Sequence, residues 1–160
     1  MLYPQLLARD FEKLPRALRL FHSAPGGGIA TGTATVRRTS GWLAVLIGFP
    51  PSGDSIPLRL QVIASEGQEI WIRSFGGVEL RTVQRQEGDL LLEAAGPVRI
   101  TFRVFADGKG MRFRLQRARF WIFPLPLRIE AHEWGSDSSW EFQVTVAGVG
   151  SYCGTMVPTV

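Results

Sequence analysis

Between Ile29 and Val157, apolar and polar side chains alternate along one short segment after another, and turn residues separate the segments. A period of two is typical of strands with one buried face, and such short connections join neighbouring antiparallel strands. Parallel strands would need helical crossovers, which this pattern does not contain. The alternation therefore predicts an antiparallel meander of about nine strands.

The first 22 residues follow a different period. Apolar side chains recur every three or four residues from Tyr3 to Phe21, which indicates an amphipathic helix. Pro15 lies inside this pattern and is expected to split the helix or kink it near Leu14, because proline has no amide hydrogen to donate.

These patterns together predict an α+β, mainly β fold. A sheet of so many strands must curl or close because strands twist, and the helix is expected to pack on its concave apolar face. We therefore expect one domain over residues 1–160, with a helical segment at 1–22 and a half or full barrel over 29–157.

Composition argues against several classes of protein. Cys153 is the only cysteine and the two histidines are His22 and His132, so neither a disulfide framework nor a zinc site is expected. The motifs of nucleotide loops, nucleophile elbows and metalloproteases are absent from the sequence, and no cofactor is expected. No apolar run is long enough for a membrane span, and a soluble, cytoplasmic protein is expected.

Two apolar segments, 41–51 and 120–127, interrupt the alternation. Glycine and proline bound the first, which suggests a short helix or loop, and two prolines exclude a central strand from the second. Such a segment can plug the core or cover the rim of the barrel. It can also form the mouth of an apolar pocket or dip into a membrane surface. The candidate rim residues are Trp42, Leu46, Phe49, Trp121 and Phe123.

Trp71, Arg73 and Phe75 share one face of a predicted strand. An arginine between two aromatic rings either binds an anionic or planar ligand or stacks over the rings.

The predicted hairpin around Asp107–Gly110 is unusually basic, with seven basic residues and one acidic residue between Arg99 and Arg119. Pairing Ala106 with Met111 places Arg103 opposite Arg114, and this like-charge pair needs an acid such as Glu93 or Glu79, or an external anion. The same register turns Arg117 toward the core, unless a bulge near it restores the alternation. A nucleic-acid surface is disfavoured because the neighbouring aromatic residues alternate inward.

Glu130, His132 and Trp134 also share a strand face. This pattern is typical of an exposed polar face, and it would allow acid–base chemistry by Glu130 and His132 if the face lined a cleft.

The order of features resembles a bacterial family of domains of unknown function, number 4166. The most specific matching stretch is Trp71-Ile72-Arg73-Ser74-Phe75-Gly76. Further matches are Leu2–Pro4, Leu14–Leu18, Phe21–His22, Gly32–Ala34, Arg37–Arg38, Gly48–Gly53, Glu69–Gly77, Gly96–Val98, Pro124–Pro126 and Glu130–Glu133. Such domains also occur joined to nucleotide-binding domains that resemble saccharopine dehydrogenase, so the resemblance implies an accessory role beside a dehydrogenase-like partner. It implies no catalytic residues.

Three functions follow as hypotheses. The first is a binding domain for an apolar or amphipathic anionic, lipid-like molecule, with Trp71, Arg73, Phe75, Arg117 and His132 as candidate ligand contacts. The second is a module that docks on a dehydrogenase-like protein through its apolar loops. The third is an enzyme that uses Glu130 and His132.

Overall fold

The computed structural model describes residues 1–159 and is mainly β; Val160, the last residue of the predicted domain, lies outside the described residues. The helices are α1 (Leu2–Leu7), the 3₁₀ helix η1 (Ala8–Lys13), α2 (Arg16–Ser23) and α3 (Trp42–Leu46). The strands are β1 (Ile29–Arg38), β2 (Gly53–Ser65), β3 (Gln68–Phe75), β4 (Val78–Glu87), β5 (Leu90–Ala95), β6 (Val98–Ala106), β7 (Gly110–Phe120), β8 (Phe123–Pro124), β9 (Ile129–Gly135), β10 (Trp140–Val146) and β11 (Gly150–Thr159).

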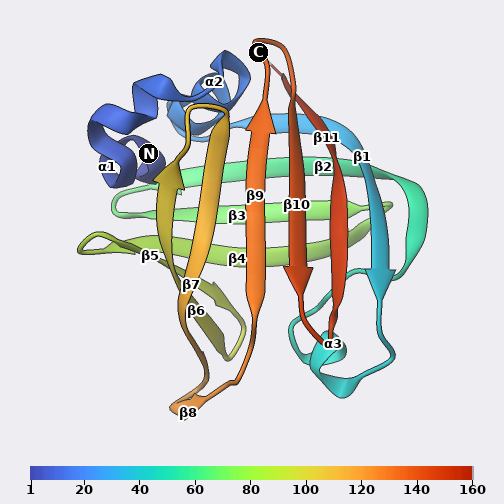
Figure 1. The fold of residues 1–160 in the computed structure, drawn as a ribbon. Coiled ribbons are helices and arrows are strands. Elements are labelled where there is room, and N and C mark those ends of the chain that lie inside the picture. The colour runs from blue at the N-terminus through green and yellow to red at the C-terminus, as the bar shows by residue number, and fades with distance from the viewer. Residues whose placement is uncertain (160) are drawn as a thin grey trace.

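The strands form a closed antiparallel barrel (Figure 1). Each strand from β1 to β6 pairs with the next, β7 pairs with β9, and β11 returns to pair with β1. Within residues 1–159, the two-residue β8 pairs only with β7. The predicted meander is therefore confirmed, and of the two predicted forms the full barrel is the one that occurs.

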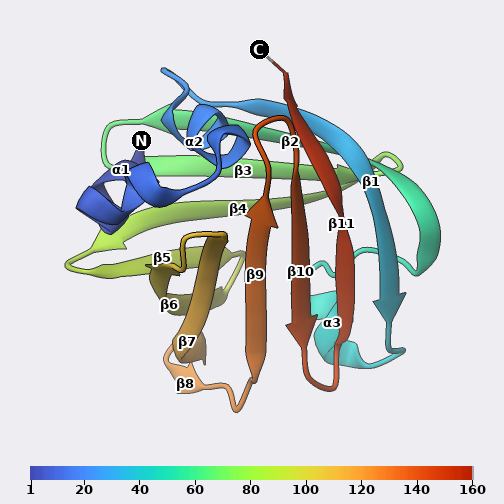
Figure 2. The same ribbon diagram turned by 45° about the horizontal axis from the view of Figure 1, so that its top comes forward.

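The N-terminal helices cover one end of the barrel (Figures 1 and 2). Pro15 separates η1 from α2, as predicted, but the first α-helix already ends at Leu7, and Ala8 after it has a positive φ of 48°. Ala17, Leu18 and Phe21 of α2 are buried against the barrel core. The amphipathic face found in the sequence thus closes the barrel instead of lying along its wall.

The β6–β7 hairpin follows the predicted register from Ala106–Met111 to Phe102–Leu115. The register then shifts, so that Thr101 pairs with Arg117 and Gln116 is the extra residue of a bulge. Beyond Arg114, β7 no longer pairs with β9. The bulge therefore lies where β7 leaves its neighbour in the barrel wall.

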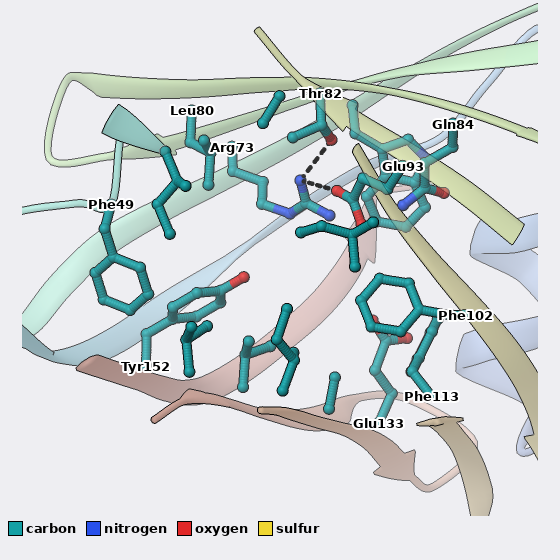
Figure 3. A pocket seen from close by; sticks show the side chains of 18 of the residues that line it. Phe49, Arg73, Leu80, Thr82, Gln84, Glu93, Phe102, Phe113, Glu133 and Tyr152 are labelled. Atoms are coloured by element: carbon teal, nitrogen blue, oxygen red, sulfur yellow. Dashed lines mark hydrogen bonds and ion pairs between the residues drawn. The ribbon is translucent and has the colours of Figure 1, made fainter. Parts of the chain in front are cut away.

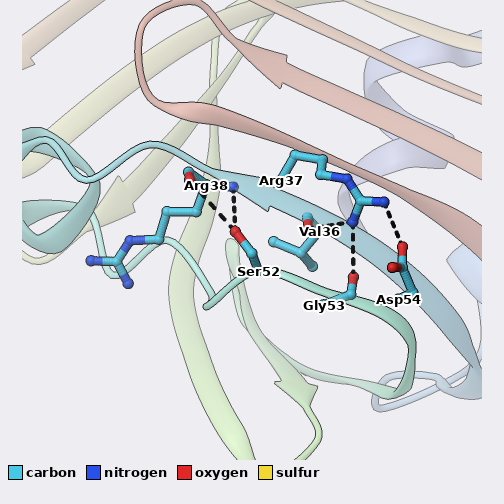
Figure 4. Close-up of polar contacts among 6 residues, drawn as sticks. All are labelled: Val36, Arg37, Arg38, Ser52, Gly53 and Asp54. Carbon is cyan, nitrogen blue, oxygen red and sulfur yellow. Dashed lines mark hydrogen bonds and ion pairs between the residues drawn. The ribbon is translucent and has the colours of Figure 1, made fainter.

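The segment with α3 is tied to the ends of β1 and β2 (Figure 4). Ser52 Oγ accepts a hydrogen bond of 2.8 Å from the Arg38 amide, and Arg37 donates to Gly53 O and Asp54. Arg38 also donates to Phe49 O at 3.0 Å. These contacts hold Ile47 and Phe49 against the barrel interior, where both line a cavity.

Among the described residues, no helix combines the length and the apolar character that crossing a membrane requires.

Candidate binding cavity

The barrel encloses a cavity of about 120 Å³ (Figure 3). Most of its wall is apolar, contributed by loop 47–49 and by strands from both halves of the barrel. The apolar lining includes Ile47, Phe49, Leu80, Ile100, Phe102, Phe113, Ile129, Val144 and Val146. A few polar side chains converge on this space, which is typical of a small-molecule site.

Arg73 carries the positive charge of the cavity wall. Its Nη1 donates to Thr82 Oγ1 at 2.9 Å and lies 3.3 Å from Glu93 Oε1, so the guanidinium charge is balanced inside the protein (Figure 3). Burial lowers the pKa of Arg73, but Glu93 and two tyrosines outweigh it and raise that pKa, so Arg73 is charged. The other guanidinium N–H groups have no hydrogen-bond acceptor among residues 1–159 and are not sealed from the cavity.

Tyr152 and Glu133 face the cavity from the opposite wall (Figure 3). Burial, with Glu93 and Glu133 nearby, raises the pKa of Tyr152, so its hydroxyl is protonated and able to donate. Glu133 Oε2 lies 3.4 Å from His22 Nε2 of α2. Donors and acceptors therefore flank the apolar space on two sides.

A second polar cluster seals the helical end of the cavity. Glu69 is 1% exposed and accepts two hydrogen bonds, from the Leu2 amide at 2.7 Å and from Trp71 Nε1 at 3.1 Å. The hydroxyl of Tyr3 donates to Gln84 Oε1 at 3.0 Å, and burial raises the pKa of Tyr3 well above its ordinary value. These bonds join α1 to β3 and β4, so the helix is a fixed part of the cavity wall.

The predicted motif on β3 lies inside the barrel. Trp71 and Arg73 line the cavity, and the Arg73 Cζ lies 4.9 Å from the centre of the Trp71 ring. Phe75 is buried and lines a smaller hollow of about 60 Å³, which shares Arg73, Glu133 and Tyr152 with the main cavity. The alternation thus placed on one strand face three side chains that border the same region of the barrel interior.

Arg117 does not reach the cavity. The bulge at Gln116 turns Arg117 outward, where it is exposed, and Ala118 takes the buried position instead.

The predicted role of Glu93 also needs correction. Asp89, not Glu93 or Glu79, pairs with Arg103 at 2.8 Å, while Glu93 faces inward to Arg73.

His132 and Glu130 line a hollow on the outer surface between β7, β9 and β10. His132 also borders the inner cavity, but its ring packs on Trp134 at 4.7 Å and its Nε2 lies 3.5 Å from Asp107 Oδ2. Burial and Arg112 lower the pKa of His132. The face of Glu130 and His132 is therefore separate from the polar cluster of Arg73, Glu93 and Tyr152.

The apolar loop residues divide into two groups. Phe49 is 4% exposed and belongs to the cavity wall, whereas Leu46 is half-buried and does not line the cavity. Trp42, Trp121 and Phe123 are 71%, 68% and 63% exposed and do not line the cavity.

Thr82, Glu93, Glu133 and Tyr152 were missed as site residues in the sequence. Each occupies an inward position of its strand, and this is the signal that could have identified it: Glu93 alternates with Leu91 and Ala95, and Glu133 follows Ile129 and Ala131. Within residues 1–159, no three His, Cys, Asp or Glu side chains are grouped to hold a metal.

Comparison with models of protein families, with curated proteins and with solved structures finds no match for this chain. The resemblance to family 4166 stays a prediction.

Proposed function

We propose that this protein is a binding domain for an apolar or amphipathic small molecule, held in the barrel cavity. The observation that carries the proposal is a mainly apolar space inside the barrel, on whose wall Arg73 presents guanidinium N–H groups that have no acceptor among residues 1–159. The Tyr152 hydroxyl supplies a further donor nearby. A ligand with an apolar body and an oxygen-bearing end would match these groups.

The volume limits the part of the ligand that the cavity buries. An apolar cavity of about 150 Å³ takes a benzene molecule. The cavity here, at about 120 Å³, fits a single ring or a short branched chain. A long acyl chain would have to leave it, and the outer hollow is adjacent because Phe113, Ile129 and Ala131 line both spaces.

The charge of the ligand's polar end follows from the Arg73–Glu93 pair. Because Glu93 balances Arg73 and Glu133 lies across the cavity, an anionic head group gains less from Arg73 than the sequence suggested. A hydroxyl, carbonyl or protonated carboxyl group accepts the same hydrogen bonds without adding negative charge. We therefore place a neutral acceptor ahead of a carboxylate.

Calorimetric titration with benzyl alcohol, benzoate and benzylamine tests this proposal. We expect saturable binding of benzyl alcohol in the micromolar-to-millimolar range that ligand efficiency allows for so few atoms. Benzoate should bind more weakly, because Glu93 and Glu133 oppose a further negative charge. Benzylamine is the opposite control: its ammonium accepts no hydrogen bond from Arg73 but can donate to Glu133, so binding tighter than that of benzyl alcohol would contradict selection by Arg73.

Ala131→Leu supplies the structural control, because Ala131 lines the cavity and a leucine there fills part of it. Binding of benzyl alcohol should fall at least ten-fold in the folded variant. Ala147→Leu, at an exposed turn position, should bind like the wild type. Undiminished binding by Ala131→Leu, or no saturable binding of any probe, would contradict the proposal.

A further inference from the structure

Three large apolar side chains project into solvent at the turn between β7 and β8. Trp121, Ile122 and Phe123 are 68%, 78% and 63% exposed. The turn is firmly held, because the Trp121 amide donates to Pro97 O at 2.9 Å and the Trp121 ring stacks on Phe120. Trp121 also has a φ of 55°, a conformation that a bulky residue adopts only when its surroundings impose it. The structure thus holds these side chains in water and does not fold them onto the core.

A second apolar point lies along the same edge of the molecule. Trp42 and Val45 of α3 are 71% and 67% exposed. In both ribbon views, α3 and β8 lie at the lower edge, away from the helices α1 and α2 (Figures 1 and 2). Two separate apolar tips at one edge fit a flat, fluid surface better than they fit a single groove on a partner.

Arginines surround the β7–β8 tip. Arg99 and Arg119 are directly opposite on β6 and β7, Arg119 is also opposite Pro124, and Arg117 and Arg128 are close along the chain. All four are exposed. None forms an ion pair with another described residue. Like charges placed opposite each other on neighbouring strands repel, so this group calls for an external anion.

We propose that this edge docks on an anionic lipid bilayer, with Trp121, Ile122 and Phe123 inserted among the headgroups and Arg99, Arg117, Arg119 and Arg128 contacting lipid phosphates. Aromatic and aliphatic tips gain from burial at the acyl boundary, and tryptophan is suited to the interface itself. The arginines supply the attraction to negative charge. This inference does not depend on the cavity or on its ligand.

Co-sedimentation with phosphatidylcholine vesicles, with and without phosphatidylglycerol, tests the docking. The wild type should bind the phosphatidylglycerol vesicles and leave the neutral vesicles largely free. Ile122→Ser/Phe123→Ser should lower this binding at least ten-fold. Ile63→Ser/Val157→Ser, which removes apolar side chains that are 41% and 49% exposed outside this edge, should leave it unchanged.

The charge contribution has its own matched pair. Each arginine near an anionic surface contributes roughly five-fold to binding. Arg117→Gln/Arg119→Gln should therefore weaken binding about 25-fold. Arg59→Gln/Arg81→Gln, at exposed positions of β2 and β4 without ion pairs among the described residues, should leave it unchanged.

Three results would overturn the proposal. The first is wild-type protein that does not bind phosphatidylglycerol vesicles. The second is equal losses in the edge variants and in their controls. The third is sedimentation equilibrium that shows a dimer which Ile122→Ser/Phe123→Ser dissociates, since the tip would then be an interface between two copies. Thermal unfolding of each variant confirms that it is folded when tested.

Discussion

Several polar side chains inside this barrel have hydrogen-bond or ion-pair partners that come from distant parts of the chain. Glu69 accepts from Leu2 and Trp71, Tyr3 donates to Gln84, and Arg73 pairs with Glu93. A buried polar group costs free energy unless it is hydrogen-bonded. Removing one member of such a pair is therefore expected to cost more than removing both.

The Arg73–Glu93 pair allows this to be measured. Arg73→Met leaves Glu93 as an unpaired charge at a site where its side chain is 16% exposed, and should lower the free energy of unfolding by about 3–5 kcal/mol. Arg73→Met/Glu93→Met removes both charges and should lie within about 1–2 kcal/mol of the wild type. Urea unfolding of the two single variants and the double variant gives the coupling. Additive losses would show that the pair is not coupled.

Among the residues of the candidate site, the sequence predicts those on β3 but not their partners on other strands. Alternation on one strand placed Trp71, Arg73 and Phe75 on a single face, and the structure buries that face in the barrel. It does not predict that Glu93 lies beside Arg73, because β3 and β5 are separated in the sheet by β4, and the two side chains meet across β4. Contacts between strands that are two apart depend on two registers, which no single segment encodes.

Among the elements, β7 shows how one extra residue decides which side chains face the interior. Leu115 is partly buried and packs against the core, Gln116 and Arg117 are both exposed, and Ala118 is buried. The bulge thus keeps a basic residue out of the core while the apolar series continues one position out of phase. The sequence predicts this bulge because the alternation itself is broken there.

Deletion of Gln116 tests the role of the bulge. Without Gln116 the pairs Phe102–Leu115 and Ile100–Ala118 can both persist, so the variant should fold and lose less than about 3 kcal/mol. Deletion of Arg114 is the matched comparison, since the strand then regains its pairing only by turning Leu115 outward and Gln116 inward. Its loss should be larger by several kcal/mol, because an amide replaces a core leucine. Equal stabilities by urea unfolding would contradict this account.

At the scale of the whole molecule, barrel closure creates both proposed surfaces. Pairing of β11 with β1 encloses the cavity, and the helices cover one end while the apolar tips project at the lower edge (Figure 2). The sequence predicts the meander and the helix but leaves closure and the cavity open. Closure depends on the strand twist accumulated over the whole sheet. The cavity volume is the small difference between the space inside the barrel and the volume of the side chains that fill it.

The central claim is that a ligand enters the barrel cavity that Trp71 and Arg73 both line, and NMR tests it most directly. Titration with benzyl alcohol should shift the indole N–H resonance of Trp71 and the guanidinium resonance of Arg73, with one shared saturation curve. The resonances of Trp121 and Arg59, outside the cavity, should stay in place. Shifts confined to exposed groups such as Trp121, or unchanged Trp71 and Arg73 resonances, would contradict the claim.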